Sequence, residues 1–371
     1  MRVAFYAPMK PPQNPVPSGD RRIARLLLGA LRLAGHDPIV ASTFRSREPK
    51  GNITRQARLA ELGQKLALRL VKQWRGPKPD VWLTYHLYYK APDWIGPLVA
   101  DAWGIPYVVV EASYAPKRAG GPWDIGHRAV ADAVRYASAV LCLNPNDKAC
   151  LQPLGTARLL DLPPFLDTVP FAGADGARHA LSAQYGLDAS QPWLLAVGMM
   201  RVGDKLSSYT VLAEALSEIQ QDPWQLLIVG DGAAEQEVRA LFAPFGPRVA
   251  WLGQLAEAAL AQVYKSADIM VWPAIREAFG MALLEAQAAG LPVVAGRTDG
   301  VPAVVTDGET GLLPSPGDAS AFAAAVQTLL HNTARREAMG QAAQARAIGH
   351  HSIQSAAATL DRILQDVTCR S

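Results

Sequence analysis

Residues 269–295 read IMVWPAIREAFGMALLEAQAAGLPVVA, and this stretch predicts a strand, a helix and a second strand in succession. The apolar run 269–272 is typical of a buried strand. The alanine- and leucine-rich segment after it favours a helix, which Gly290 and Pro292 end. Residues 293–295 are again short and wholly apolar. Two apolar strands joined by a helix are typical of a parallel sheet that is covered on both faces.

The same alternation of apolar runs and helix-like segments occurs in two successive sets. The first set of candidate strands comprises 3–7, 38–41, 81–85, 107–110, 140–143 and 157–160. The second set comprises 193–197, 226–229, 249–252, 269–272, 293–295 and 311–313. The proline-rich segment 161–170 between them lacks periodicity, which indicates a linker. We therefore predict an α/β protein with two doubly wound parallel sheets, since 371 residues exceed the usual size of a single core.

Glu277 and Glu285 stand eight positions apart, on either side of the start of the predicted helix. Gly280 lets a ligand approach backbone N–H groups that have no partner within the helix, and the helix dipole favours an anion there. The arrangement suits a sugar nucleotide. Glu277 would then face the sugar hydroxyls. The N–H groups of Gly280, Met281 and Ala282 would face the phosphate, and Glu285 would accept hydrogen bonds from the ribose hydroxyls. The alternative interpretation is a surface-loop glutamate followed by a solvated helix glutamate.

The residues around this pair resemble the retaining glycosyltransferases of family 4, whose signature is a Glu-x7-Glu pair. The matching segments are AFG at 278–280, LEA at 284–286, GLPVVA at 290–295 and DGETGLL at 307–313. The resemblance covers roughly residues 193–330 and implies that Phe279 lines the donor site. It also implies the GT-B fold, in which two Rossmann-like domains face each other across a cleft. Residues 1–168 would form the acceptor-side domain and 169–351 the nucleotide-sugar donor domain, with 352–371 crossing back to the first domain.

The second predicted domain opens with GMMRVGDK at 198–205, directly after a strand. A departing diphosphate gains negative charge, which a guanidinium and an ammonium stabilise without a metal. Arg201 and Lys205 are the candidates for this role. Family members usually carry the arginine immediately after the glycine, where this chain has Met199, whereas the lysine lies at a typical distance. The alternative is that both are ordinary solvated loop cations.

Further donor-site candidates follow from the resemblance. Gly253 and Leu255 lie where relatives hold the nucleotide base with backbone groups, whereas VGDG at 229–232 is interpreted as a structural strand-to-helix turn. Gly19 lies between the first strand and the first helix, where relatives use glycine so that the backbone approaches the donor phosphates. Asp20 next to it either caps that helix or contacts the acceptor.

One expected histidine is absent. Many relatives place a histidine after the fourth strand of the first domain, but this chain has Glu111 in the run YVVVEASY at 107–114. Glu111 or Ser113 could contact the sugar or the acceptor in its place. His86 and His127 are further candidates for this contact, although a lone histidine is more often structural.

Charge is unevenly distributed along the chain. Residues 1–80 hold 16 Lys and Arg against 5 Asp and Glu, whereas the whole chain has a net charge of only +3. Within this region, residues 55–75 combine basic residues with leucines at near-helical spacing. Such a basic amphipathic stretch either lies on an anionic membrane surface or packs its apolar face on the sheet. Nucleic acid is not an expected partner because no known binding module accompanies the charge.

The sequence also indicates in which compartment the protein resides and whether it holds a metal ion. No run approaches the ~18 apolar residues of a membrane-spanning helix, and the N-terminus lacks the apolar core of a signal peptide. We therefore expect a cytoplasmic protein, with peripheral contact at the inner membrane face as an option. The three cysteines lack metal-ligand spacing and are odd in number, so we expect neither a metal site nor a disulfide framework.

The resemblance implies a retaining glycosyltransferase that moves a hexose-type sugar to a hydroxyl acceptor in a glycan, glycolipid or polysaccharide. The donor would be a nucleotide-diphosphate sugar, a UDP- or GDP-sugar, and no cofactor would be required. Two different functions stay open. One is a sugar-nucleotide epimerase with the same fold, and the second is a catalytically silent scaffold that binds a sugar nucleotide.

Overall fold

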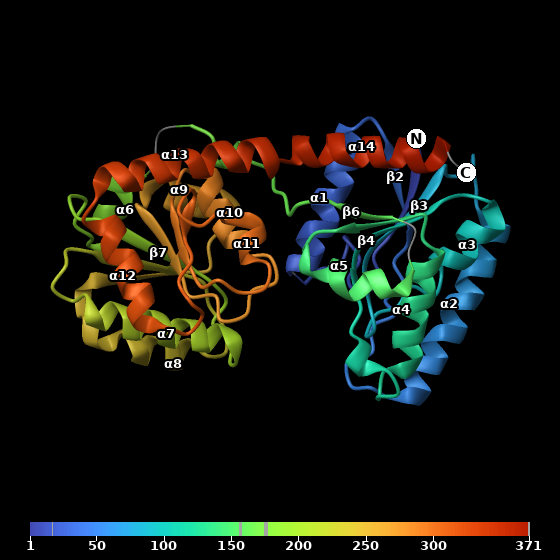
Figure 1. Cartoon of the computed structure of the whole chain (residues 1–371), viewed down its shortest axis with the longest axis horizontal. Helices are drawn as coiled ribbons and strands as arrows, with labels where there is room; N and C mark the ends of the chain where they lie inside the picture. The colour runs from blue at the N-terminus through green and yellow to red at the C-terminus, as the bar shows by residue number, and fades with distance from the viewer. Residues whose placement is uncertain (17, 156–157, 174–176, 370–371) are drawn as a thin grey trace. The chain divides into compact units, whose positions relative to one another are not determined.

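The structure is a computed structural model that describes residues 1–16, 18–155, 158–173 and 177–369 (Figure 1). It divides into two compact units. The first comprises Met1–Pro163 together with the C-terminal helix α14 (Ile353–Cys369), and the second is Pro164–Ser352. Each unit is a parallel sheet with helices on both faces, so the predicted α/β fold with two doubly wound sheets is confirmed.

The first unit has a six-stranded parallel sheet in the order β2-β1-β3-β4-β5-β6. Its strands are β1 (Arg2–Tyr6), β2 (Asp37–Ser42), β3 (Val81–Tyr88), β4 (Tyr107–Ser113), β5 (Ala139–Cys142) and β6 (Leu159–Asp161). Its helices are α1 (Gly19–Leu33), α2 (Ile53–Gln73), α3 (Gly96–Trp103), α4 (Asp124–Tyr136), α5 (Asn146–Leu151) and α14. The central strands are largely apolar because helices cover both of their faces. Ala157, the first residue of the sixth expected strand, lies outside the described residues.

The helix α1 begins at a serine cap rather than at Asp20. The side chain of Ser18 accepts a hydrogen bond from the Arg21 N–H at 3.2 Å, which satisfies a donor at the helix start. The capping role considered for Asp20 is therefore wrong, and its carboxylate is available for a different partner. At the far end of the chain, α14 packs along α1, and Ile353 lies against Gly29.

The second unit has a six-stranded parallel sheet in the order β12-β11-β10-β7-β8-β9. Its strands are β7 (Trp193–Val197), β8 (Gln225–Val229), β9 (Val249–Gly253), β10 (Ile269–Trp272), β11 (Val293–Ala295) and β12 (Gly311–Leu312). Its helices are α6 (Arg178–Tyr185), α7 (Asp204–Glu218), α8 (Glu235–Phe242), α9 (Glu257–Ser266), α10 (Met281–Ala288), α11 (Val301–Val304), α12 (Ala319–Leu330) and α13 (Thr333–His350). The core of this unit includes the fully buried Trp193 and Trp224.

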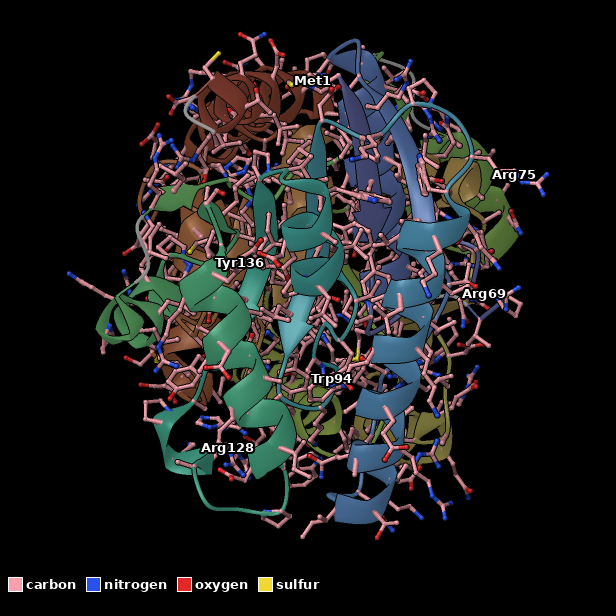
Figure 2. All side chains as sticks on the ribbon, turned by 90° about the vertical axis from the view of Figure 1, so that its right-hand side faces the viewer. Met1, Arg69, Arg75, Trp94, Arg128 and Tyr136 are labelled. Atoms are coloured by element: carbon pink, nitrogen blue, oxygen red, sulfur yellow. The ribbon has the colours of Figure 1, made fainter. Side chains whose placement is uncertain are left out.

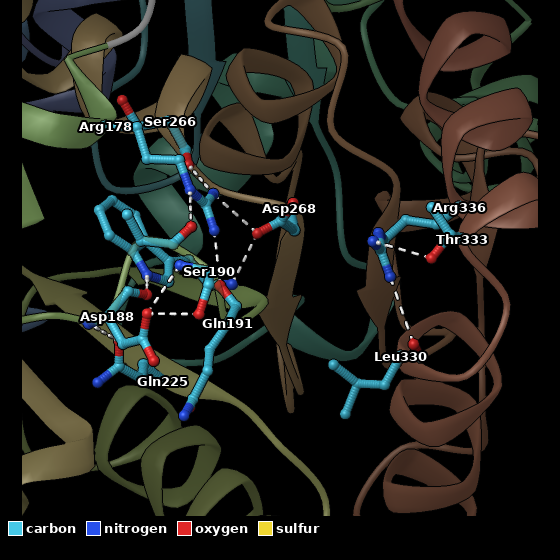
Figure 3. A network of polar contacts seen from close by, with 12 residues as sticks. Arg178, Asp188, Ser190, Gln191, Gln225, Ser266, Asp268, Leu330, Thr333 and Arg336 are labelled. Carbon is cyan, nitrogen blue, oxygen red and sulfur yellow. Dashed lines mark hydrogen bonds and ion pairs between the residues drawn. The ribbon is translucent and has the colours of Figure 1, made fainter.

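A polar network fixes the N-terminal edge of this second sheet (Figure 3). Arg178 donates to the Asp268 carboxylate at 2.9 Å and to the Ser266 carbonyl at 2.7 Å. Asp268 also accepts from the Trp193 N–H at 2.7 Å, which joins the starts of β7 and β10. The carboxyl ends of the strands lie at the opposite edge, where ligands usually bind in open α/β sheets.

No helix within the described residues combines the length and the apolar character that crossing a membrane requires. The expected basic stretch 55–75 forms most of α2, which ends at Gln73. The inner side of this helix packs on the core of the first unit through residues such as Ala67 and Leu70. The apolar face therefore packs within the first unit, chiefly beside α3 and α4 rather than on the sheet as predicted, and the outer side of the helix, with Leu62, remains exposed.

Candidate functional site

The loop between β10 and α10 brings Glu277 next to Lys205, although the two are far apart in the sequence. Lys205, in the first turn of α7, donates to Glu277 Oε2 at 2.5 Å. Trp272 Nε1 lies 3.4 Å from the same oxygen, and the Lys205 ammonium lies 5.0 Å from the centroid of the Trp272 ring. The side chains of Glu277 and Lys205 are only 19% and 27% exposed. This carboxylate is therefore held by a partly buried ion pair, and the interpretation of a free surface-loop glutamate is wrong.

The start of α10 presents N–H groups to the same place. Gly280 precedes the helix with φ of 67°, a left-handed conformation that favours glycine, and no side chain caps the helix. Leu283 and Leu284 donate to the Gly280 carbonyl, but among the described residues the N–H groups of Met281 and Ala282 have no acceptor. Donors of this kind at a helix start favour an anion.

Glu285 lies one turn further along α10 and is only 3% exposed. Its Oε2 accepts a hydrogen bond from the Tyr264 hydroxyl at 2.9 Å, and Tyr264 is fully buried on α9. A buried carboxylate needs such partners because it has lost its hydration. The interpretation of a solvated helix glutamate is therefore wrong, whereas the expected contact of Glu285 with ribose hydroxyls stays a prediction.

The loop after β7 lies against the turn after β8. A Cβ atom at Gly230, which has φ of 135°, would come within 1.9 Å of the Gly198 carbonyl oxygen, so only glycine allows these backbones to meet. This contact explains VGDG at 229–232 as a structural turn. Gly230 also donates to the Gly253 carbonyl at 2.9 Å, so that carbonyl already has a partner.

The remaining donor-site candidates lie at varied depths. Leu255 and Phe279 are half-buried, as are Met281 and Ala282. Arg201 is exposed, and within the described part of the chain it forms no ion pair with a carboxylate. The structure thus pairs Lys205, but not Arg201, with Glu277.

A second group of titratable side chains lies at the carboxyl edge of the first sheet. His86 Nδ1 lies 2.8 Å from Asp20 Oδ1, and His86 Nε2 lies 3.9 Å from Glu111 Oε1. His86 and Glu111 have φ of 60° and 64°, a conformation that is unusual for residues other than glycine. Such backbone strain is concentrated at functional sites. The structure thus joins three of the four acceptor-side candidates into one group, which we call the Asp20–His86–Glu111 group.

Comparison with known proteins decides the family. The model of the glycosyl transferases group 1 family matches residues 191–332. A D-inositol 3-phosphate glycosyltransferase of Kineococcus radiotolerans is 33% identical over 319 residues, which cover 76% of this chain and 72% of that protein. The chain belongs to the group 1 glycosyltransferases. It is therefore an enzyme that transfers a sugar from a nucleotide-sugar donor, and the epimerase and the silent scaffold are set aside.

Further relatives of this glycosyltransferase are more distant or match a shorter part of it. A phosphatidyl-myo-inositol mannosyltransferase of Mycobacterium leprae is 37% identical over 170 residues, 45% of each chain. A solved glycosyltransferase from Rickettsia africae has a TM-score of 0.76 at 18% identity and covers 100% of this chain and 99% of its own. Anabaena HepE, solved with UDP-glucose, has a TM-score of 0.69 at 17% identity, with both chains fully covered (100%). These structures share the fold.

The charge state of the Asp20–His86–Glu111 group follows from its surroundings. Burial lowers the pKa of His86, but the charge of Glu111 and the hydrogen bond to Asp20 outweigh burial and raise it to about 9. The imidazole of this glycosyltransferase is therefore protonated at neutral pH. Burial also raises the pKa of Glu111, against the effect of His86. Asp147 on α5 belongs to the same surroundings, because burial and the charge of Glu111 raise its pKa to about 6.

One oxygen of this group has no hydrogen-bond partner among the residues that the structure describes. Glu111 is 5% exposed, and its Oε2 accepts no hydrogen bond from any described residue. The Tyr85 hydroxyl lies close enough to lower the pKa of Glu111, but the two groups do not meet the geometry of a hydrogen bond. Leaving a buried oxygen unpaired costs roughly 1–3 kcal/mol, so a ligand donor at this position would be stabilising.

The remaining first-unit candidates lie elsewhere. His127 is 3% exposed, its ring stacks on Tyr114 with centroids 4.6 Å apart, and its Nε2 lies 3.0 Å from the Ala115 carbonyl oxygen. It is therefore a structural histidine. Ser113 ends β4 beside Tyr88 of β3, and no contact joins it to the Asp20–His86–Glu111 group in the described structure. A Cβ at Gly19 would meet nothing within 4 Å, so the space above this glycine is open.

No group of three or more His, Cys, Asp or Glu side chains within the described residues could hold a metal ion. Sequence reasoning missed Trp272 and Asp147 as members of the two groups. Trp272 could have been found from its place at the end of the strand before Glu277. Asp147 gives no comparable signal, because only the fold brings α5 to the end of β4.

Proposed function

We propose that this glycosyltransferase moves a hexose-type sugar from a UDP- or GDP-sugar to a hydroxyl group of a glycan or lipid-linked acceptor, with retention at the anomeric carbon. The observation that carries the proposal is the Lys205–Glu277 pair, 2.5 Å apart, beside the open N–H groups at the start of α10.

The donor would lie over this edge of the second sheet. The N–H groups of Met281 and Ala282 would donate to the diphosphate, and Glu285 would accept from the ribose hydroxyls. Glu277 would accept from hydroxyls of the transferred sugar, since its second oxygen is outside the 2.5 Å contact with Lys205. Relatives support this choice of donor, because HepE was solved with UDP and with UDP-glucose.

Catalysis would rest on charge stabilisation and positioning. As the bond from the anomeric carbon to the diphosphate breaks, negative charge grows on the leaving oxygen beside Lys205 and the helix N–H groups. Preorganised donors of this kind contribute about 2.7–4 kcal/mol each to lowering a barrier. The leaving phosphate would take the proton of the incoming hydroxyl on the same face, so no side-chain nucleophile and no metal are needed.

The Asp20–His86–Glu111 group would act on the acceptor side. The protonated His86 can donate from one ring nitrogen while Asp20 holds the second, which fixes the orientation of the ring. The Glu111 Oε2 atom would accept a hydrogen bond from a hydroxyl of the sugar or of the acceptor. This group would thus take the place of the histidine that many family members have after the fourth strand.

A lipid-linked acceptor is supported by the outer side of α2. Arg58, Lys65, Arg69 and Lys72 on this helix are exposed, and Leu68 among them is 63% exposed. Figure 2 shows Arg69 and Arg75 pointing away from the helix into solvent. Basic side chains mixed with exposed leucine favour contact with an anionic membrane.

The experiment is donor turnover by the purified protein. Release of nucleotide from UDP- and GDP-sugars is measured for the wild type, for Glu277→Gln and for a matched control, Glu237→Gln, which removes an exposed carboxylate from α8 of the same unit. We expect turnover by the wild type and the control and its loss in Glu277→Gln. Equal turnover by all three proteins would contradict the proposed role of Glu277.

A further inference from the structure

A cavity of about 470 Å³ lies on one face of the first sheet, between the edge strand β2 and the helix α2. Most of its lining is apolar, and these apolar residues are Ile39, Ala41, Leu66, Leu70, Trp74 and Ile95. The cavity has no residue in common with the Asp20–His86–Glu111 group or with the Lys205–Glu277 pair. Its volume is typical of a site for a small ligand.

The arrangement of helices explains why this apolar surface is not covered. The helix α1 packs against β2, whereas α2 packs mainly beside α3 and α4. Ile39 and Ala41 stand two positions apart on β2, so both side chains lie on the face of the strand that borders the cavity. Both residues are only half-buried. An apolar hollow that stays open to solvent often marks a binding site.

Two arginines at the cavity carry charge that no carboxylate neutralises. Arg69 Nε donates to Gln73 Oε1 at 2.8 Å, which orients the guanidinium, and Arg75 follows the end of α2. Within the described residues neither arginine pairs with a carboxylate. Both side chains extend to the same side of the first unit in Figure 2. Since arginine binds phosphate in a bidentate geometry, this lining suits a ligand that combines an alkyl chain with a phosphate head group.

The basic residues of α2 lie on the side of the helix that borders the cavity. Spacings of four and three residues alternate along this side, which we call the basic face of α2 and which consists of Arg58, Leu62, Lys65, Arg69 and Lys72. Arg69 belongs both to this face and to the lining of the cavity. A membrane surface that contacts the basic face would therefore lie at the opening of the cavity.

We propose that the cavity binds one alkyl chain of an anionic phospholipid from the membrane that the basic face of α2 contacts. The chain would lie against Ile39, Ala41 and Leu66, and the head group would meet Arg69 and Arg75. The inference rests on the membrane contact in the proposed function and adds a lipid site to it. Because burial of a chain does not depend on charge, the enzyme would stay on the membrane at salt concentrations that screen the basic face.

The first experiment uses soluble alkyl phosphates as probes. Octyl phosphate and decyl phosphate are titrated in a calorimeter at concentrations below micelle formation. Ala41→Phe fills the cavity from β2. The matched control is Leu68→Phe, which adds a ring of the same kind at a position on α2 that is 63% exposed and outside the cavity.

We expect decyl phosphate to bind the wild type about fifteenfold more tightly than octyl phosphate, because each buried methylene strengthens binding about fourfold. Binding of decyl phosphate should weaken about tenfold or more in Ala41→Phe and stay unchanged in Leu68→Phe. Should Ala41→Phe fail to fold by circular dichroism, Leu66→Gln provides the same comparison, because it places a polar group in the wall of the cavity. Equal dependence on chain length in the wild type and the cavity variant would overturn the inference.

A pair of double variants tests the head group. Arg69→Gln/Arg75→Gln removes both arginines of the cavity. Arg128→Gln/Arg135→Gln removes the same charge from exposed positions on α4, where each arginine pairs with a nearby aspartate. Decyl phosphate should bind the first double variant about tenfold more weakly than the second. Equal binding by the two would overturn the role of the anionic head group.

Vesicles test whether the lipid comes from a membrane. Phosphatidylcholine vesicles contain phosphatidic acid with a photoreactive diazirine on its chain. The wild type should form crosslinks at Ile39, Ala41 and Leu66, and it should stay bound at salt concentrations that release Ala41→Phe. Crosslinks confined to residues outside the cavity, such as Leu62 and Leu68, would overturn the inference and leave the membrane contact standing. No sedimentation of the wild type would contradict the membrane contact and overturn the membrane as the source of the lipid.

Donor turnover in the same preparations separates this inference from the proposed glycosyl transfer. Turnover by the wild type without cavity-dependent binding of decyl phosphate would overturn the lipid site and leave glycosyl transfer standing. Cavity-dependent binding without turnover of any UDP- or GDP-sugar would support the lipid site and contradict the proposed transfer reaction.

Discussion

Replacing Lys205 with glutamine should lower turnover far more than it lowers stability. The Lys205–Glu277 contact is 2.5 Å, and at an effective dielectric constant of about 20 such a pair attracts by roughly 6–7 kcal/mol before desolvation is subtracted. The two side chains are 27% and 19% exposed, so lost hydration and lost rotamer freedom offset most of this attraction. The net loss of unfolding free energy should be about 1 kcal/mol. The loss of a leaving-group cation should raise the barrier by about 2.7–4 kcal/mol, which is roughly a hundred- to thousandfold in rate.

The assay is single-turnover release of nucleotide from the donor, with urea unfolding of the same preparations. Arg239→Gln is the matched control, since Arg239 pairs with Glu235 at 2.8 Å and lies 4.5 Å from the Trp251 ring centroid in the same unit. The Arg239→Gln variant should lose about as much unfolding free energy as Lys205→Gln without losing turnover. EDTA should leave the wild-type rate nearly unchanged. Full turnover by Lys205→Gln, or strong dependence on added Mg²⁺ or Mn²⁺, would contradict the proposed role of Lys205 as the leaving-group cation.

Three further predictions concern the donor helix, the buried histidine and the outer side of α2. Glu285→Gln should weaken donor affinity in calorimetry, because ribose contacts are equal in the ground and transition states. Glu277→Gln should mainly lower the rate. An unchanged dissociation constant for Glu285→Gln would contradict the proposed position of the ribose at α10. The folded pKa of His86 is raised from 6.5 to about 9, so its contribution to stability is complete below pH 6.5 and is lost as pH rises through 9. Urea unfolding of His86→Gln should therefore vary less over this interval than unfolding of the wild type, and parallel curves would argue against a charged His86. Neutralising four exposed cations of α2 should abolish sedimentation with anionic vesicles at low salt, because each basic residue near the surface contributes ~1 kcal/mol of binding free energy. No sedimentation of the wild type would refute membrane contact. The four are Arg58, Lys65, Arg69 and Lys72.

Much of the fold could be predicted because its strands are largely apolar. Parallel strands buried on both faces, such as 107–110 and 226–229, stand out from the polar loops around them, and each of the twelve expected strands has a counterpart among the twelve strands of the described structure. The Glu277 loop could be predicted for a related reason. A glycine at a helix start and a carboxylate before it lie next to each other in the sequence, so local physics places them.

Contacts between distant segments could not be predicted in this way. The partner of Glu285 is Tyr264 on a separate helix, and nothing in a single sequence pairs them. A cavity in the first unit is lined by Lys10, Arg47 and Lys90, and it could not be predicted because these residues come from three loops that only the sheet order β2-β1-β3 brings together. Its only signal is the excess of basic residues before position 80, and the near-helical spacing of residues 55–75 draws attention to α2 instead. The left-handed backbone at His86 and Glu111 likewise depends on tertiary structure.

A crystal structure of the protein with a bound UDP-sugar would test the proposed donor site directly. We expect the diphosphate within hydrogen-bonding distance of the Met281 and Ala282 N–H groups and of the Lys205 ammonium, with Glu277 at the sugar hydroxyls. A diphosphate bound instead among Arg45, Arg47 and Lys90 would contradict the proposed donor site.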